Sequence, residues 1–355
     1  MSQPSAQLLS PRIFAFDVMK SLAIVGVVYL HASELVVNNL LSITSPTRWL
    51  MVTTLNASWR WSVPVLLMVS GALALDSTRS SRPNYICNRL LRLSVALTAG
   101  IMFQSVTNWF TTGSSPSVSQ LMHALIFDQP YGYLYFLCIL LLLTPFTPRL
   151  STWLSKLNRQ QSLIVTGLAL IVSSAVFSFS RFVLLLLPTY LGFFMAGKTL
   201  QQCKLSQKRH VLLAILSIIG IASISTFALY LEKTLGLTSV WTQQYITYMQ
   251  NASPGVIMMS IFAYTMMLSP IVFNWIQKRS QLSSGVSLIA KYSLGIYLLH
   301  VPIMQLIRFF IPQIEALYIS LPLVTTLLVV VSVVGLSIVL SFLLSRFSIG
   351  KMIVS

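Results

Sequence analysis

Long apolar segments alternate with short polar stretches along the whole chain. A membrane-spanning helix needs about 20 mostly apolar residues, and by that rule the sequence predicts about ten such helices. The turn between the fifth segment and the sixth consists only of Ser180 and Arg181, and the fourth segment is short, so a count of about eight or nine also fits the pattern. We therefore expect an all-α integral membrane protein without a soluble domain. The approximate ranges of the segments are 13–35, 50–75, 93–111, 133–148, 162–180, 182–200, 210–231, 254–276, 286–309 and 319–345.

The composition supports this interpretation. Of 355 residues, 55% are hydrophobic and 8% are charged, and the mean hydropathy is +0.81. Soluble domains contain roughly 25% charged residues, so the composition excludes that class. The net charge of +17 by itself suggests nucleic acid as a partner. The distribution of the basic residues along the chain favours a membrane-topology signal instead, so we expect no nucleic acid partner.

The basic residues gather in alternate loops. Cytoplasmic loops of membrane proteins are enriched in Lys and Arg, and 18 of the 23 basic residues fall in one set of loops. This bias predicts that both termini are cytoplasmic. The first set is Arg12, Lys20, Arg79, Arg82, Arg89, Arg92, Arg149, Lys156, Arg159, Lys198, Lys204, Lys208, Arg209, Lys278, Arg279, Lys291, Arg346 and Lys351, and the other is Arg48, Arg60, Arg181, Lys233 and Arg308.

The first apolar segment carries four ionisable residues on one helical face. Lys20 and His31 are eleven positions apart, about 16 Å along a helix, and point in nearly the same direction. Asp17 and Glu34 flank them on the same stripe, which must face other helices or a polar cavity because ionisable groups in lipid are costly. Lys20 can bind an anion at the cytoplasmic end, and His31 can move a proton deeper in the membrane. Alternatively, Asp17 and Lys20 form a plain ion pair.

A second polar face occurs near the end of the chain. Ser293, Tyr297 and His300 are spaced i, i+4 and i+7, which places them on one side of a helix. Pro302 follows the histidine, and such local irregularity is tolerated beside a cavity. The spacing is equally compatible with an interhelical hydrogen-bond network.

Five segments, in order along the chain, resemble motifs of the acyltransferase-3 family, the membrane O-acyltransferases of bacterial surface polysaccharides. The first is a basic residue, ten intervening residues and a histidine. "SVPVLLMVSG" is similar to VPxFFFxSG, and "NRLLRL" to RxxR. "GYLYFLCILLL" and "KYSLGIYLLHVP" resemble the (W/Y)FL and YSxxIYLxH motifs. The residues that match in the first three segments are Asp17, Lys20, His31, Val63, Pro64, Ser70, Gly71, Arg89 and Arg92.

Two departures from the family pattern affect the expected site. Lys20 stands where many members have arginine, so charge is kept but bidentate binding of phosphate is lost. The stretch "VLLM" lacks the phenylalanines of the motif, which changes the expected shape of a cavity there.

The resemblance implies one membrane domain over residues 1–355 that transfers an acyl group, most often acetyl, from cytoplasmic acyl-CoA to a sugar hydroxyl. It implies a multi-pass protein of the bacterial cytoplasmic (inner) membrane, with acetyl-CoA as co-substrate and no tightly bound cofactor. The acceptor would be a surface polysaccharide or its lipid-linked precursor, and succinyl stays open as the acyl group. No metal site is expected, since the four histidines and six acids have no compact ligand spacing.

The polar residues can be assigned to steps of this chemistry. His31 is the predicted general base, and Glu34 orients its ring. Tyr297 and His300 are candidates for holding the acceptor or the oxyanion. The predicted donor-binding residues are Lys20, Arg89, Arg92 and Ser293, although the two arginines also fit a pure topology signal. Arg60 is a candidate acceptor contact or, alternatively, a snorkelling interfacial residue.

A polytopic carrier or flippase for a lipid-linked oligosaccharide or a small solute is the main alternative. Intramembrane Lys, His and Glu serve proton relays in such proteins equally well. Carriers often show repeated halves with broken helices in matching positions, and the sequence shows no such repeat. The RxxR segment and the late histidine have no evident purpose in a carrier, so the acyltransferase hypothesis is favoured.

Overall fold

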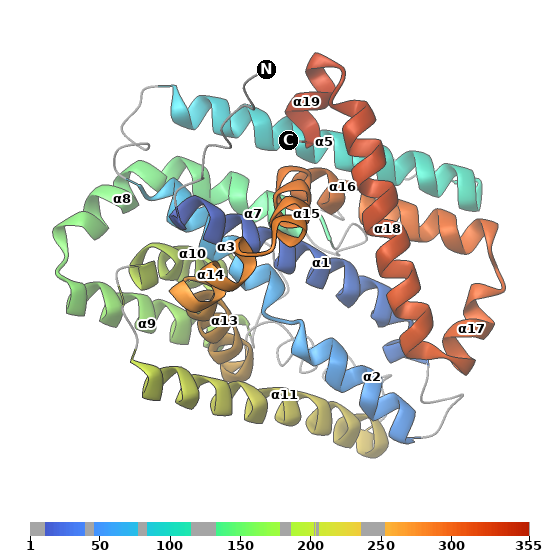
Figure 1. Cartoon of the computed structure of the whole chain (residues 1–355), viewed down its shortest axis with the longest axis horizontal. Coiled ribbons are helices and arrows are strands. Elements are labelled where there is room, and N and C mark those ends of the chain that lie inside the picture. The colour runs from blue at the N-terminus through green and yellow to red at the C-terminus, as the bar shows by residue number, and fades with distance from the viewer. Residues whose placement is uncertain are drawn as a thin grey trace.

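The computed structural model describes residues 11–39, 46–76, 84–114, 133–177, 186–201, 203, 206–235 and 253–354, and in these ranges every regular element is a helix (Figure 1). The predicted turn at Arg181 and the basic residues Arg79, Arg82 and Lys204 lie outside the described residues. The elements are α1 (Pro11–Asn39), α2 (Pro46–Ser58), α3 (Ser62–Ala74), α5 (Tyr85–Thr112), α7 (Tyr135–Leu143), the 3₁₀ helix η3 (Thr144–Phe146), α8 (Thr147–Lys156), α9 (Arg159–Phe177), α10 (Leu186–Gln201), α11 (Gln207–Leu235), α13 (Pro254–Met267), α14 (Pro270–Gln277), α15 (Ser280–Lys291), α16 (Ser293–Phe310), α17 (Ile314–Ser320), α18 (Pro322–Leu344) and α19 (Ser348–Val354).

Within the described residues, six helical stretches are long and apolar enough to cross a membrane, which confirms the all-α, multi-pass class. Arg159–Val172 and Pro254–Met267 are shorter apolar helices. The six stretches are Phe14–Glu34, Tyr85–Thr112, Tyr135–Lys156, Gln207–Ile224, Ser293–Phe310 and Pro322–Leu344.

Three predicted continuous segments are each divided into two helices. Segment 50–75 forms α2 and α3, with a turn at 59–61 between them, and segment 254–276 forms α13 and α14. Pro64 and Pro270 stand in the first turns of α3 and α14. The missing N–H of proline is tolerated in a first turn, whereas a proline inside a helix would break it. Segment 286–309 begins within α15 and is interrupted at Tyr292, before α16. The interruptions place Arg60 and Ser293 at helix boundaries rather than within helices.

Helix α1 lies at the centre of the bundle, and α2, α3, α15, α16 and α18 all contact it (Figure 1). Of its apolar stretch Phe14–Glu34, 67% is buried, compared with 17% for the stretch Gln207–Ile224 of α11 at the periphery. The apolar residues of α1 are mostly enclosed by other helices, whereas its four ionisable side chains are partly exposed. Because such groups are costly in hydrocarbon, we expect the space beside them to be polar.

Two glycines allow α3 and α10 to pack backbone against backbone. A methyl group added at Gly71 would overlap the carbonyl oxygen of Phe194, and one added at Gly197 would overlap that of Met68. Small residues permit such close approach between membrane helices. The neighbouring Ser70 lines a cavity, so this packing also determines the position of one wall of the site described below.

We expect Gly71→Ala to destabilise the protein, because α3 and α10 must separate to accommodate the methyl group. Overpacking of this kind costs roughly 1–3 kcal/mol. Thermal unfolding of the detergent-solubilised protein should show a clearly lower midpoint temperature. Gly167→Ala on α9 is the matched control, since nothing lies within 4 Å of the added atom. Equal midpoints for the two variants would contradict the packing argument.

Candidate active site

A basic vestibule opens between α1, α5, α15 and the start of α16. Its volume is about 430 Å³. The predicted ion pair within it is present, with Lys20 Nζ 3.8 Å from Asp17 Oδ1 and both side chains partly exposed. Three cations against one carboxylate make the vestibule suitable for a polyanion. The lining residues are Asp17, Lys20, Arg92, Ser287, Ala290, Lys291, Ser293 and Leu294.

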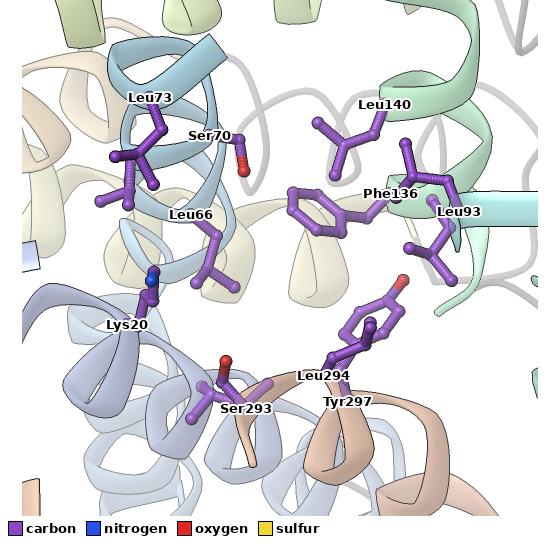
Figure 2. Close-up of a pocket in the computed structure, with 13 residues that line it drawn as sticks. Lys20, Leu66, Ser70, Leu73, Leu93, Phe136, Leu140, Ser293, Leu294 and Tyr297 are labelled. Carbon is purple, nitrogen blue, oxygen red and sulfur yellow. The ribbon is translucent and has the colours of Figure 1, made fainter. Parts of the chain in front are cut away.

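A narrower cavity of about 150 Å³ adjoins the vestibule (Figure 2). The two spaces share Lys20, Ser293 and Leu294, so the cation of Lys20 stands where the wide space passes into the narrow one. The walls of the narrow cavity are almost entirely apolar, and its other lining residues are Ile24, Leu66, Val69, Ser70, Leu73, Leu93, Phe136, Leu137, Leu140 and Tyr297. An uncharged flexible chain fits these walls, whereas a charged group does not.

Tyr297 separates this cavity from a pair of histidines. It lies one turn beyond Ser293 on α16, lines the cavity and packs against Phe136 with ring centroids 5.5 Å apart. Its hydroxyl donates to the carbonyl oxygen of Tyr133. The ring of Tyr133 in turn packs edge-on against His300 at 5.2 Å. Tyr297 thus contacts both the cavity and the surroundings of His300.

His300 is completely buried and has a defined tautomer. Its Nδ1 lies 2.7 Å from the carbonyl oxygen of Tyr297, and because a carbonyl only accepts, Nδ1 carries the proton. Its Nε2 therefore presents a lone pair, and it has no hydrogen-bond partner among the described residues. An unpartnered buried nitrogen is unusual in a folded protein and needs an explanation.

His31 faces His300 from α1, with ring centroids 5.1 Å apart. The Nδ1 of His31 lies 3.4 Å from Glu34 Oε2, which places its proton toward the carboxylate and leaves Nε2 as a base. The side chains of His31 and Glu34 are 31% and 50% exposed, while His300 is 0% exposed. One imidazole of the pair is thus accessible and the other is enclosed.

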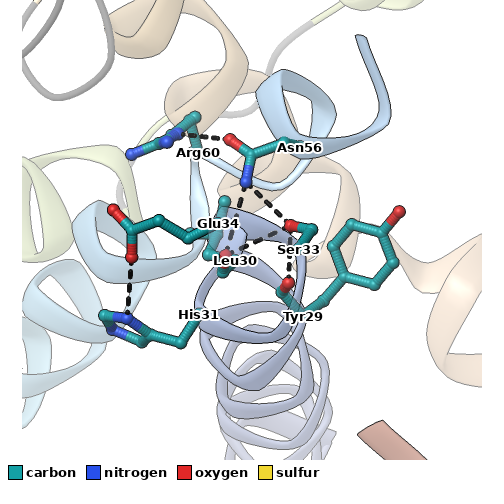
Figure 3. A network of polar contacts seen from close by, with 7 residues as sticks. All are labelled: Tyr29, Leu30, His31, Ser33, Glu34, Asn56 and Arg60. Carbon is teal, nitrogen blue, oxygen red and sulfur yellow. Dashed lines mark hydrogen bonds and ion pairs between the residues drawn. The ribbon is translucent and has the colours of Figure 1, made fainter. Parts of the chain in front are cut away.

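Arg60 reaches the same end of α1 through Asn56 (Figure 3). Its Nε donates to Asn56 Oδ1 at 3.0 Å, and the amide nitrogen of Asn56 donates to Ser33 Oγ at 2.8 Å. Arg60 is also close enough to Glu34 to interact with it electrostatically. This network joins the turn between α2 and α3 to the turn of α1 that carries His31 and Glu34.

The structure brings most of the predicted site residues together in two groups. The vestibule is lined by Lys20, Arg92 and Ser293. The second group is the pair of His31 and His300 together with Glu34, Tyr297 and Arg60, which lie around it. Arg89 stands apart: it is not among the residues that line the vestibule, and its Nη1 donates to the hydroxyl of Tyr85 at 2.9 Å.

Sequence reasoning missed Lys291, Asn56, Ser33 and Tyr133. Asn56 and Ser33 had a usable signal, because each is a polar residue inside an apolar helix that the bundle buries. Lys291 fits the topology pattern of the basic residues, and nothing in its sequence context marks it as part of a site. In the described part of the chain, no group of three or more His, Cys, Asp or Glu side chains is placed to hold a metal ion.

Comparison with protein families gives one match, to a family described as an acyltransferase domain, over residues 13–346. Comparisons with curated proteins and with solved structures gave no match. The matched region contains every residue of the vestibule, the cavity and the histidine pair.

Proposed function

The chain belongs to the acyltransferase-3 family and is a multi-pass membrane acyltransferase, and from this premise we propose that it transfers an acetyl group from cytoplasmic acetyl-CoA to a hydroxyl of a cell-surface polysaccharide or its lipid-linked precursor. The observation that carries the proposal is the order along α1 of two spaces and a histidine pair. A polycationic vestibule is followed by an apolar cavity, and a pair of imidazoles lies beyond Tyr297.

Each part of the donor has a chemically suitable environment in this arrangement. The phosphates of CoA bind in the vestibule, where Lys20, Arg92 and Lys291 supply charge-assisted hydrogen bonds. The uncharged pantetheine arm enters the apolar cavity past Ser293, and the thioester approaches Tyr297. A succinyl group fits these walls less well, because its carboxylate would lose its hydration without a compensating partner.

His31 is the proposed general base. Its Nε2 removes the proton of the acceptor hydroxyl as the oxygen attacks the thioester carbonyl. Collapse of the tetrahedral intermediate breaks the C–S bond, and the imidazolium returns the proton to the CoA thiolate. Glu34 holds Nδ1–H and stabilises the charged ring while the proton is on it. Tyr297 and His300 hold the acceptor or the oxyanion from the side of α16.

The acceptor reaches His31 from the outer side. Ten membrane spans with both termini in the cytoplasm, in a bacterial inner membrane, place Lys20 near the cytosol and His31 deeper in the bilayer. The exposed His31 and Glu34 and the neighbouring Arg60 support an acceptor contact at this end. In length and in two of its motifs the chain resembles the O-acetyltransferase of enterobacterial common antigen, so this glycan is the first acceptor to test.

We expect His31→Ala to lower acetyl transfer from acetyl-CoA by at least about 100-fold, because a positioned base contributes that factor or more. Mass spectrometry of the surface glycan from cells with either form of the protein would measure the loss of acetyl esters. His210→Ala, on the peripheral α11, is the control and should leave acetylation intact. If His31→Ala retains transfer at normal expression, His31 is not the base.

Arg92→Ala should raise the KM for acetyl-CoA by about 5- to 10-fold, since Arg92 lines the vestibule and a partly solvated ion pair contributes only modestly. The change for Arg89→Ala should be smaller, because Arg89 does not line the vestibule and is bonded to Tyr85. Steady-state kinetics at varied acetyl-CoA would measure both. Equal effects of the two substitutions would indicate a general field of positive charge instead of a defined phosphate site.

The proposed topology predicts where a fused reporter is active. Green fluorescent protein at the C-terminus should fluoresce, and alkaline phosphatase at the same position should be inactive, since the basic loops and both termini face the cytoplasm. The opposite pattern would reverse the side from which the vestibule is entered and with it the source of the donor.

A further inference from the structure

Asn56 is a buried amide with three hydrogen bonds, two to the histidine end of α1 and one to Arg60. It lies on α2 with 3% of its surface exposed. Its Nδ2 donates to Ser33 Oγ at 2.8 Å and to the carbonyl oxygen of Leu30 at 3.4 Å, and its Oδ1 accepts from Arg60 Nε at 3.0 Å (Figure 3). The amide can therefore be held in only one orientation, because a flip would set its oxygen against the Leu30 carbonyl.

The α1 atoms that Asn56 binds belong to the turn that carries the proposed base. Leu30 precedes His31, and its carbonyl is the helical acceptor for the N–H of Glu34 in an i→i−4 ladder. Ser33 precedes Glu34, and its hydroxyl donates to Tyr29 or Leu30 within the same turn. Asn56 thus holds the turn of α1 from which the Glu34 side chain extends.

On its other side Asn56 orients Arg60. The guanidinium is held by its Nε, and its remaining nitrogens lie on the same side of the network as the Glu34 carboxylate in Figure 3. Glu34 faces His31 and Arg60, Arg60 also faces Tyr135 from α7, and His31 faces His300 from α16. The charge and position of Glu34 are therefore coupled to a residue that Asn56 fixes.

We infer that Asn56 is a positioning residue, which holds Glu34 and Arg60 so that Glu34 keeps the His31 ring in its reactive orientation. The inference rests on the proposed function, in which His31 is the base. A base must be held within about 0.5 Å of its productive position, and a displacement of about 1 Å can cost roughly 100-fold in rate. Loss of Asn56 should therefore lower kcat. It should leave donor binding unaffected, since Lys20 in the vestibule lies eleven residues before His31 along α1.

The test compares Asn56→Ala, Glu34→Gln and the double variant in the full-length protein. Asn56→Ala should lower kcat by about 10- to 100-fold and leave the KM for acetyl-CoA unchanged. Because Asn56 acts through Glu34, the double variant should be no slower than Glu34→Gln alone. Thr53→Val is the matched control, since Thr53 lies one turn earlier on α2, is equally buried and has no partner for its hydroxyl among the described residues.

Several results would overturn the inference. They are an unchanged kcat for Asn56→Ala, a kcat as low in Thr53→Val, and additive losses in the double variant. If Asn56→Ala does not accumulate as folded protein, Asn56→Asp serves in its place, because it keeps the size and the acceptor for Arg60 but loses both donors.

A second measurement separates this inference from the proposed function. Modification of His31 by diethyl pyrocarbonate, followed by peptide mass spectrometry, needs no acyl transfer. The rate at which His31 is modified should rise when Asn56→Ala is introduced into the protein with Glu34. The same substitution should leave the rate unchanged in the Glu34→Gln variant. If His31→Ala retains transferase activity, the proposed base is wrong, yet this comparison still decides whether Asn56 positions His31. Equal modification rates with and without Asn56 would refute the positioning role.

Discussion

The structure depends on one constraint, the placement of four ionisable groups on one face of an otherwise apolar helix. Asp17, Lys20, His31 and Glu34 cannot face hydrocarbon at acceptable cost, so α1 must be surrounded by protein. The bundle meets this requirement by placing α2, α3, α15, α16 and α18 around it. The same arrangement creates the spaces of the site, because the groups that cannot face lipid must instead be left with partners or with room for polar ligands.

Periodicity along the chain predicted the polar faces but not their meeting. The spacing of His31 with Lys20, and of His300 with Ser293, placed each histidine on a face of its own helix. That the two rings lie 5.1 Å apart depends on how α1 packs against α16, which no local pattern contains. Arg89 and Arg92 show the same limit. They are three positions apart on one helix, yet Arg92 lines the vestibule and Arg89 donates a hydrogen bond to Tyr85, since a rotation of about 60° decides which neighbour each side chain meets.

Helix interruptions were the feature least visible in the sequence. Hydropathy averages over a window, so the segments containing Pro64 and Pro270 were predicted as continuous although proline can only begin a new helix there. The interruption at residues 59–61 matters for the site, because it places Arg60 in a turn against the end of α1. Polar backbone at such a break is tolerated in a membrane only where protein or a cavity surrounds it.

Broken helices beside buried charges also occur in carriers, which bind solutes at such breaks. Both a carrier and a transferase can use the two imidazoles. In both imidazoles Nδ1 lies against an acceptor, which leaves the two Nε2 atoms as bases, and one of these is completely buried. A ring with a protonated Nδ1 and a free Nε2 can serve a proton relay or a general base equally well. The family membership of residues 13–346 therefore decides between the two, and it identifies a transferase.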